Sequence, residues 1–104
     1  MKAIYIDGHG GNEVVHVGER PTPVRRNGEV LIHMQASTLN QVDLYMRQSG
    51  AGITHQLPQN LGLEGFGQVA ACDVDNGLVV GDGVIIHPGI SCGECEFCQR
   101  GDDV

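Results

Sequence analysis

Short apolar segments that end at Gly, Pro or Asn are the feature that most constrains how this chain can fold. Segments of five to eight residues between turn-forming residues predict β-strands, because helices need longer amphipathic stretches. Within 29–36, Val30 and every second residue as far as Ala36 share one face, which is the alternation of a half-buried strand. The predicted strands cover 2–7, 14–18, 29–36, 67–74 and 83–87.

The segment 40–48 departs from this pattern. Its apolar residues between Val42 and Met46 lack the alternation of a strand. Asn40 is a favourable N-cap residue, and Gly50 can end a helix. We therefore expect one or two helical turns here.

The whole chain is expected to form one mainly β domain over residues 1–104, a partly open β-barrel with one or two short helical turns and a cysteine loop at its end. Sixteen glycines, two Tyr, two Phe and no Trp predict many turns around an aliphatic core. No internal repeat, charge block or Ser- or Pro-rich linker divides the sequence.

The charge balance excludes several classes of partner. Thirteen acidic and six basic side chains give a formal net charge of −7, which repels nucleic acid and anionic membrane surfaces. The apolar run at the N-terminus reaches Asp7 within a few residues, too soon for a signal peptide or a spanning helix. We expect a soluble, cytoplasmic protein.

The most specific motif is a C-x2-C-x2-C spacing formed by Cys92, Cys95 and Cys98. Three thiols this close, in a loop with flanking glycines, can supply three of the four ligands of a structural zinc site. A thioredoxin-like pair and unliganded core cysteines are the alternatives, and they fit a Gly- and Glu-rich loop less well. Cys72, inside an apolar segment, is expected to be a buried small hydrophobe, and 73–77 a turn.

Three further motifs precede the cysteine loop in a characteristic order. They are Gly62-Leu63-Glu64-Gly65-Phe66-Gly67, Val80-Gly81-Asp82-Gly83-Val84 and Pro88. In this order the chain resembles the GroES-like N-terminal domain of the medium-chain, zinc-type alcohol dehydrogenase and quinone oxidoreductase family, over essentially its whole length. The resemblance implies an NAD(P)-dependent oxidoreductase whose substrate-side domain is this one.

The resemblance also implies a structural zinc bound by Cys92, Cys95, Cys98 and a fourth cysteine several residues later. No cysteine follows Cys98 in the 104 residues. Asp102, Asp103, a water or a neighbouring molecule is expected to complete the site, with His87 as a substitute ligand. Zinc is expected to be substoichiometric or absent in the monomer.

Alcohol-oxidising members of the family bind a catalytic zinc through a Cys and a His at the positions that Asn40 and Leu63 occupy here. Neither replacement is a plausible zinc ligand, so no catalytic metal is expected. Asn40 and Tyr45 instead resemble the metal-free quinone and enone reductases, in which polar side chains there orient substrate and nicotinamide. Alternatively, Asn40 is simply a helix cap and Tyr45 a half-buried core ring. Glu64 is expected to pair with an Arg.

The sequence contains no G-x-G-x-x-G fingerprint of a nucleotide-binding Rossmann domain. The glycines at 62, 65 and 67 have the reverse order and are expected to let backbones pass closely. The leading interpretation is a substrate-side domain that reduces a quinone, enone or carbonyl only together with such a domain, and is inactive alone. The alternative is a free-standing binding or structural module that self-associates through 40–46 and the turn near Leu63 and Phe66.

Overall fold

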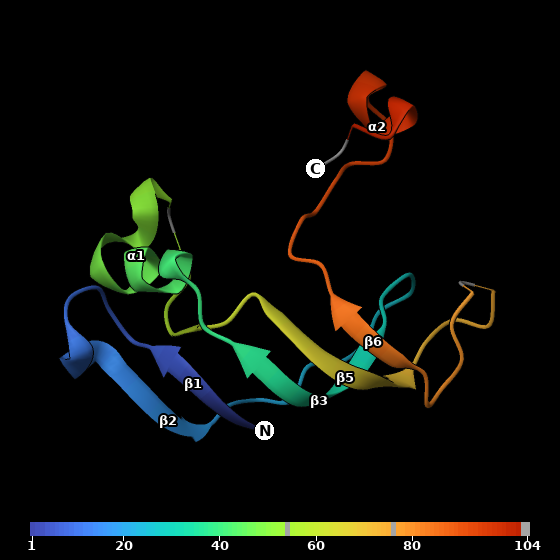
Figure 1. The fold of residues 1–104 in the computed structure, drawn as a ribbon. Helices are drawn as coiled ribbons and strands as arrows, with labels where there is room; N and C mark the ends of the chain where they lie inside the picture. Colours follow the sequence, from blue (N-terminus) through green and yellow to red (C-terminus); the bar gives the residue numbers. More distant parts are fainter. Residues whose placement is uncertain (54, 76, 103–104) are drawn as a thin grey trace.

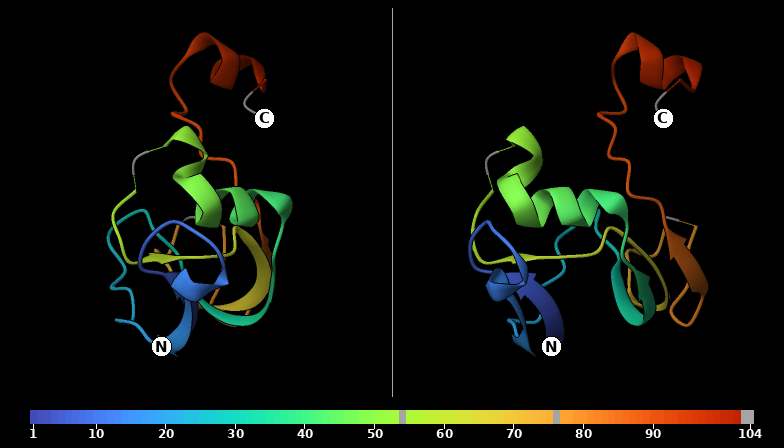
Figure 2. Two further views of the ribbon diagram at one scale, coloured as in Figure 1. Left: turned by 90° about the vertical axis from the view of Figure 1, so that its left-hand side faces the viewer. Right: turned by 60° about the vertical axis from the view of Figure 1, so that its left-hand side comes forward.

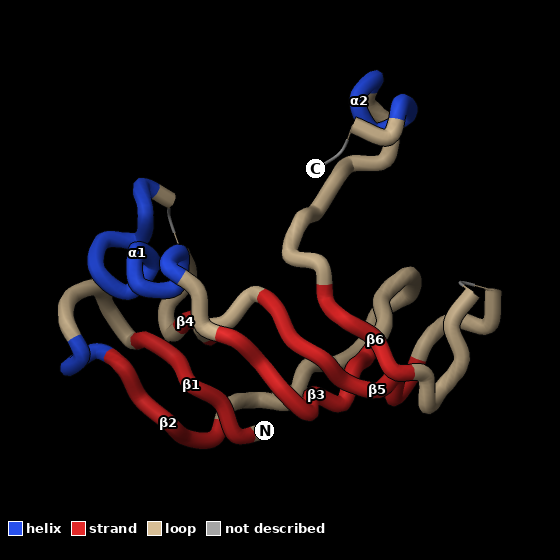
Figure 3. Tube along the Cα trace, in the orientation of Figure 1, coloured by secondary structure: helices blue, strands red, loops and turns tan. Residues whose placement is uncertain are grey.

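The computed structural model describes residues 1–53, 55–75 and 77–102, which form two three-stranded antiparallel sheets (Figures 1 and 3). The first sheet has the order β2-β1-β4, and the second has the order β3-β5-β6. The strands of the first sheet are β1 (Lys2–Ile6), β2 (Val15–Glu19) and β4 (Gln59–Asn60). Those of the second are β3 (Leu31–Thr38), β5 (Glu64–Ala71) and β6 (Gly83–Ile86). The mainly β prediction is confirmed.

Two glycines explain why β5 starts earlier than predicted. A Cβ atom on Gly65 would lie 2.5 Å from the carbonyl oxygen of Ala36, and one on Gly67 would lie 2.5 Å from that of His33. These positions therefore allow β5 to approach β3 closely along a pairing that begins at Glu64. β5 begins and ends three residues earlier than the predicted strand 67–74, so Cys72 lies just beyond the end of β5.

The prediction that side chains alternate between a buried and an exposed face along β3 is wrong in part. The pairing of β3 with β5 changes register between Leu31 and Ile32 and again between Met34 and Ala36. Each such irregularity inserts a residue and turns the following side chains to the other face. The strand is half-buried only at Leu31 and Ile32, and its remaining residues are exposed.

The predicted helix is confirmed as α1 (Gln41–Ser49). Asn40 is its N-cap residue, and Gly50 ends it in the left-handed region with φ of 76°. Short 3-10 turns lie at Asn12–Val14 and Gly50–Gly52. A second helix, α2 (Glu96–Arg100), follows the cysteine loop. In the described part of the chain, no helix is long and apolar enough to cross a membrane.

The barrel is open along the space between the two sheets. A groove of about 970 Å³ lies there, and Ile6 and Val69 are the buried hydrophobic residues of the described chain. The radius of gyration is 15.7 Å, whereas a compact domain of this length has about 13 Å. Part of this extension comes from residues 87–102, which lead away from the sheets and carry α2 at their end (Figure 2).

Candidate functional site

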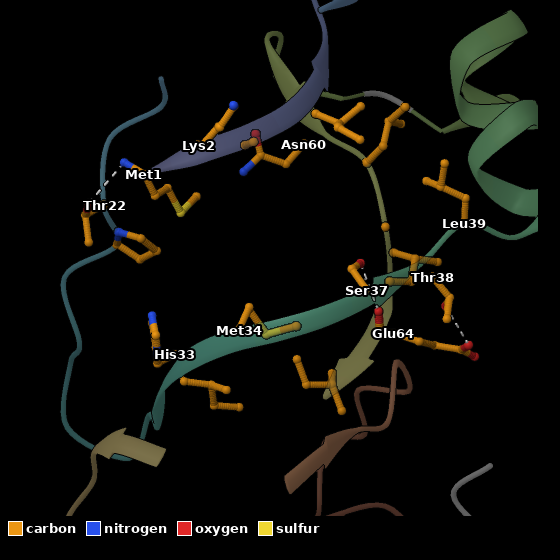
Figure 4. Close-up of a pocket in the computed structure, with 18 of the residues that line it drawn as sticks. Met1, Lys2, Thr22, His33, Met34, Ser37, Thr38, Leu39, Asn60 and Glu64 are labelled. Carbon is orange, nitrogen blue, oxygen red and sulfur yellow. Dashed lines mark hydrogen bonds between the residues drawn. The ribbon is translucent and has the colours of Figure 1, made fainter. Parts of the chain in front are cut away.

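Three polar side chains meet where β3 leads into α1. The Asn40 Nδ2 donates to Glu64 Oε2 at 3.1 Å, and the Thr38 hydroxyl donates to the same oxygen at 3.3 Å. Figure 4 shows Thr38 and Glu64 side by side at one end of the groove. The amide of Asn40 has two hydrogens, so one remains for a second hydrogen bond after the bond to Glu64 is made.

Asp43 fixes the start of α1 relative to β5. Its side chain is only 3% exposed, and its two oxygens accept hydrogen bonds from the backbone N–H groups of Asn40 and Gly62, each at 2.8 Å. Gly62 is only two positions before Glu64. Because Asp43 bonds both Asn40 and Gly62, its carboxylate sets the spacing between Asn40 and Glu64. Sequence reasoning missed this residue, although Asn-x-x-Asp is a recognisable capping signal.

The prediction that Glu64 pairs with an Arg was wrong. The side chains of Asn40 and Thr38 donate to its carboxylate instead. Its backbone oxygen also accepts a hydrogen bond from the Ser37 hydroxyl at 3.1 Å. Leu63, immediately before it, is 43% exposed and offers no ligand atom. Glu64 therefore accepts hydrogen bonds from two side chains, one at the end of β3 and the other at the N-cap of α1.

The groove continues from this cluster between β1 and β3 (Figure 4). Its walls are largely aliphatic and come from both sheets. At its far end, the amino group of Met1 donates to the backbone oxygen of Arg20 at 2.8 Å and to the Thr22 hydroxyl at 3.4 Å. Tyr45, the other predicted site residue, lies on α1 and is 50% exposed. Tyr45 is five positions after the N-cap residue Asn40, and five positions correspond to about 140° of rotation around a helix axis.

The cysteine loop gathers three sulfur atoms. The Sγ atom of Cys98 lies 3.7 Å from that of Cys92 and 3.5 Å from that of Cys95, and the three lie within 4.8 Å of one another. Thiolates at 2.3 Å from a tetrahedral ion are separated by about 3.8 Å. The donor set and its spacing therefore fit a tetrahedral thiolate metal site. Among the described residues, this is the one group of three or more His, Cys, Asp or Glu side chains placed to bind a metal.

Backbone N–H groups turn toward these sulfur atoms. Cys92 Sγ accepts from the N–H of Glu94 at 3.5 Å and of Cys95 at 3.3 Å. These bonds, first that of Glu94, together with the neighbouring thiols lower the pKa of Cys92 to about 7. Gly93, with φ of 75°, allows the tight turn between them. Because the loop stabilises a thiolate, it is suited to a cation.

The expected fourth ligands are not placed in this cluster. The carboxylate of Asp102 accepts from Arg100 Nε at 3.0 Å, and neither it nor His87 belongs to the sulfur group. Asp103 lies outside the described residues. Cys72 is half-buried, not fully buried as expected, and its thiol donates to the backbone oxygen of Leu78 at 3.4 Å.

Comparison with known proteins identifies the family. Residues 26–104 match the model of the alcohol dehydrogenase GroES-like domain. The chain belongs to this family. Relatives of this GroES-like domain include sorbitol dehydrogenase of Bacillus subtilis (strain 168), 36% identical over 85 residues, which are 78% of this chain and 24% of the relative. Quinone oxidoreductase of Lama guanicoe is 30% identical over 104 residues, 98% of this chain and 32% of the relative.

Solved structures agree with the fold of this GroES-like domain. An NAD-dependent alcohol dehydrogenase matches 99% of this chain and 30% of its own, with a TM-score of 0.90 and 38% identity. A cobalt- and zinc-bound alcohol dehydrogenase from Pyrobaculum aerophilum matches 99% of this chain and 31% of its own, with a TM-score of 0.86 and 29% identity. Escherichia coli quinone oxidoreductase complexed with NADPH matches 82% of this chain and 26% of its own, with a TM-score of 0.72 and 29% identity. The GroES-like domain thus spans about a quarter to a third of these relatives.

Proposed function

We propose that this domain forms the substrate side of an NAD(P)-dependent oxidoreductase that reduces a quinone, enone or other carbonyl compound without a catalytic metal. The observation that carries the proposal is the Asn40–Glu64 hydrogen bond, at 3.1 Å, with Leu63 beside it. An amide donor occupies the position where alcohol-oxidising relatives are expected to place a metal ligand. The donor set there is suited to hydrogen bonding rather than to binding a borderline-soft ion.

The chemistry requires negative charge to be stabilised on the carbonyl oxygen as hydride arrives. The second side-chain N–H of Asn40 can donate to that oxygen, while Glu64 orients the side-chain amide and Asp43 holds the backbone N–H of the same residue. Preorganised donors of this kind lower the barrier because they are already aligned with the developing charge. A conjugated acceptor is already polarised, so such positioning can replace a Lewis acid.

The hydride donor is proposed to be a nicotinamide dinucleotide. Two of the similar structures are an NAD-dependent enzyme and an enzyme complexed with NADPH. The 104 residues contain no dinucleotide fingerprint, and the proposal therefore assigns cofactor binding to a partner domain. We accordingly expect no turnover from this chain alone.

The cysteine loop is proposed to bind a structural zinc through Cys92, Cys95 and Cys98. The spacing of the sulfur atoms and the donated N–H bonds support this assignment. Zinc would cross-link the loop and would take no part in the reaction.

A chimaera tests the carbonyl site. The chain replaces the aligned segment of the Lama guanicoe relative, and NADPH oxidation is measured with 2-cyclohexenone and a quinone. We expect turnover, with kcat about 100-fold lower in Asn40→Ala, as for the loss of one oxyanion donor. Gln48→Ala, at an exposed position on the same helix, should not change kcat.

Two results would contradict the proposal. One is a folded chimaera whose turnover is unchanged by Asn40→Ala. The other is a chimaera that oxidises polyols and requires added zinc even after Cys98→Ser has removed the metal of the cysteine loop.

A second candidate function is a self-associating binding module. It is favoured by the exposure of large apolar side chains near α1 and the start of β5. These are Leu39, Leu44, Tyr45, Leu63 and Phe66, each at least 41% exposed. This candidate does not depend on a cofactor, and its test is the oligomeric state of the chain.

A further inference from the structure

The turn before β3 contains an Asn-Gly pair, Asn27-Gly28, at the opposite end of this strand from α1 (Figure 1). The N–H of Glu29 donates to the backbone oxygen of Arg26 at 3.1 Å and closes the turn, and Gly28 has a φ of 82°, which favours glycine. Both members of the pair are exposed. The asparagine side chain and the peptide group that follows it are therefore in contact with water.

An exposed Asn-Gly pair can be modified without an enzyme. The backbone nitrogen of Gly28 loses its proton and attacks the side-chain Cγ of Asn27. A new N–C bond forms, the C–N bond of the side-chain amide breaks, and ammonia leaves with a proton from water. Water then opens the succinimide ring to give aspartate or isoaspartate, so the net change is loss of ammonia and gain of water, without an oxidant or reductant. Glycine favours ring closure because it has no side chain to hinder the attack.

Asp73 binds the nitrogen that must react. Its Oδ2 accepts a hydrogen bond from the Gly28 N–H at 2.7 Å, and Arg25 Nη1 donates to Oδ1 of the same carboxylate at 2.7 Å. Hydrogen bonds to an ionised acceptor are roughly twice as strong as neutral ones, so this N–H is costly to release. Removal of its proton would also place a nitrogen anion beside a carboxylate, and the two like charges repel. The carboxylate of an Asp is too weak a base to remove an amide proton itself.

We propose that Asn27 is a site of spontaneous deamidation that Asp73 protects in the folded domain, and that it reacts when the bond between Asp73 and Gly28 breaks. Isoaspartate would add one carbon to the main chain of the turn that the Arg26–Glu29 bond closes. The new negative charge would lie beside the Asp73 carboxylate, which repels it. A modified chain is therefore expected to stay open at this turn. The proposal does not depend on the proposed reaction, whose residues lie at the other end of β3.

The test is peptide mapping by mass spectrometry of the 104-residue protein after incubation at pH 7 and 37 °C, because deamidation makes the Asn27 peptide one mass unit heavier. Asn27 should react about tenfold more slowly in the folded protein than in the chain unfolded in guanidinium chloride. In the unfolded chain, Asn27 and Asn76 should react at similar rates, because both precede glycine. Asp73→Ala should remove the protection in the folded protein, whereas Asp75→Ala, at an exposed position, should not change the rate.

A second measurement detects the protecting bond in the wild-type protein itself. The Gly28 N–H resonance is followed by ¹⁵N NMR as the pH falls through the pKa of Asp73, which the bond from Gly28 and then that from Arg25 lower. We expect this resonance to shift as the carboxyl group is protonated, because the acceptor loses its charge. Where Asp73→Ala does not fold, Asp73→Asn, which keeps the shape without the charge, replaces it and should also accelerate the reaction.

Four results would overturn the proposal. The first is a folded wild-type protein in which Asn27 reacts as fast as in the unfolded chain. The second is a folded Asp73 variant that reacts no faster than the wild type, and the third is an equal acceleration by Asp75→Ala. The fourth is a Gly28 N–H resonance that does not shift with the protonation of Asp73.

Discussion

Asp73 shows how one side chain can join two loops of this domain. Its carboxylate accepts from Arg25 Nη1 at 2.7 Å and from the backbone N–H of Gly28 at 2.7 Å. The same Arg25 nitrogen also donates to the backbone oxygen of Glu29 at 3.2 Å. The turn before β3 is thereby attached to the end of β5. The hydrogen bond from Gly28, and then that from Arg25, lower the pKa of Asp73 below its usual value of 3.8.

Replacement of Asp73 by Asn should therefore destabilise the fold in a pH-dependent way. A carboxyl group whose pKa is lowered in the folded state stabilises that state above its unfolded pKa, and this stabilisation is lost as the pH falls through the folded pKa. The difference in free energy of unfolding between wild type and Asp73→Asn should be constant above about pH 5 and shrink below about pH 4. Urea unfolding at pH 7 and pH 3 measures it. Asp75→Asn is the control, and an equal effect of both variants would contradict the assignment.

Cys98 and Cys72 are expected to respond differently to an added metal ion, because only Cys98 lies in the sulfur cluster. Cobalt(II) added to the reduced chain should give the visible absorption of a tetrahedral thiolate complex. Cys98→Ser should abolish that absorption because it removes the sulfur that lies within 3.7 Å of both others. Cys72→Ser should leave it unchanged, because this thiol is bonded to Leu78 instead. Loss of the absorption in both variants would argue against a site confined to the cysteine loop.

At the scale of elements, Asp43 connects the N-terminal end of α1 to the loop before β5. Asp43→Ala should leave the N–H groups of Asn40 and Gly62 without acceptors in a shielded position, which costs about 2 kcal/mol or more of unfolding free energy. The variant should also disturb the Asn40 side-chain NH₂ resonances. Gln48→Ala, on the exposed surface of α1, should cost much less. Equal unfolding midpoints for these two variants would refute the positioning role of Asp43.

The sequence alone was sufficient to predict those elements that have a signal in neighbouring residues. Asn40 and Gly50 mark both ends of α1, and the C-x2-C-x2-C spacing predicts the sulfur cluster. Other features have no such signal. The two residues of β4 pair only because β1 provides an edge, and the register changes in β3 depend on contacts with β5. The partners of Glu64 likewise depend on how β3 and β5 align, so the Arg expected from local reasoning was wrong.

At the scale of the whole molecule, the open barrel leaves little apolar surface buried. Ile6 and Val69 are the buried hydrophobic side chains of the described chain, although the sequence is 40% hydrophobic. The aliphatic walls of the groove between the sheets are therefore in contact with water. Burial of apolar surface is the main source of folding free energy, so this arrangement predicts a marginally stable domain that gains stability from any partner covering the groove.

A second copy of the chain is the partner that we expect at this face. Leu39 and Leu63 line the groove near α1 and are 62% and 43% exposed, and Phe66 follows on β5 at 41%. A contiguous exposed apolar patch is uncommon on a monomer, and two-fold pairing of identical patches is the simplest way to cover it. The net charge of −7 opposes association, so a dimer held by apolar contacts should tighten as salt screens the repulsion. Sedimentation over a concentration series at low and high salt tests this.

Paired substitutions identify the face that associates. Leu63→Asp places a charge on the patch near α1 and should return the dimer to a monomer. Val24→Asp makes the same change at a residue that is 86% exposed in the connector before β3, and it should leave the mass unchanged. A free strand edge is the competing route, because β6 ends one sheet without a partner on its outer side in the described chain. If the dimer forms through this strand edge, replacing Ile85 of β6 by Pro should dissociate it, whereas Leu63→Asp should not. A mass of one chain at every concentration and salt would rule out both routes.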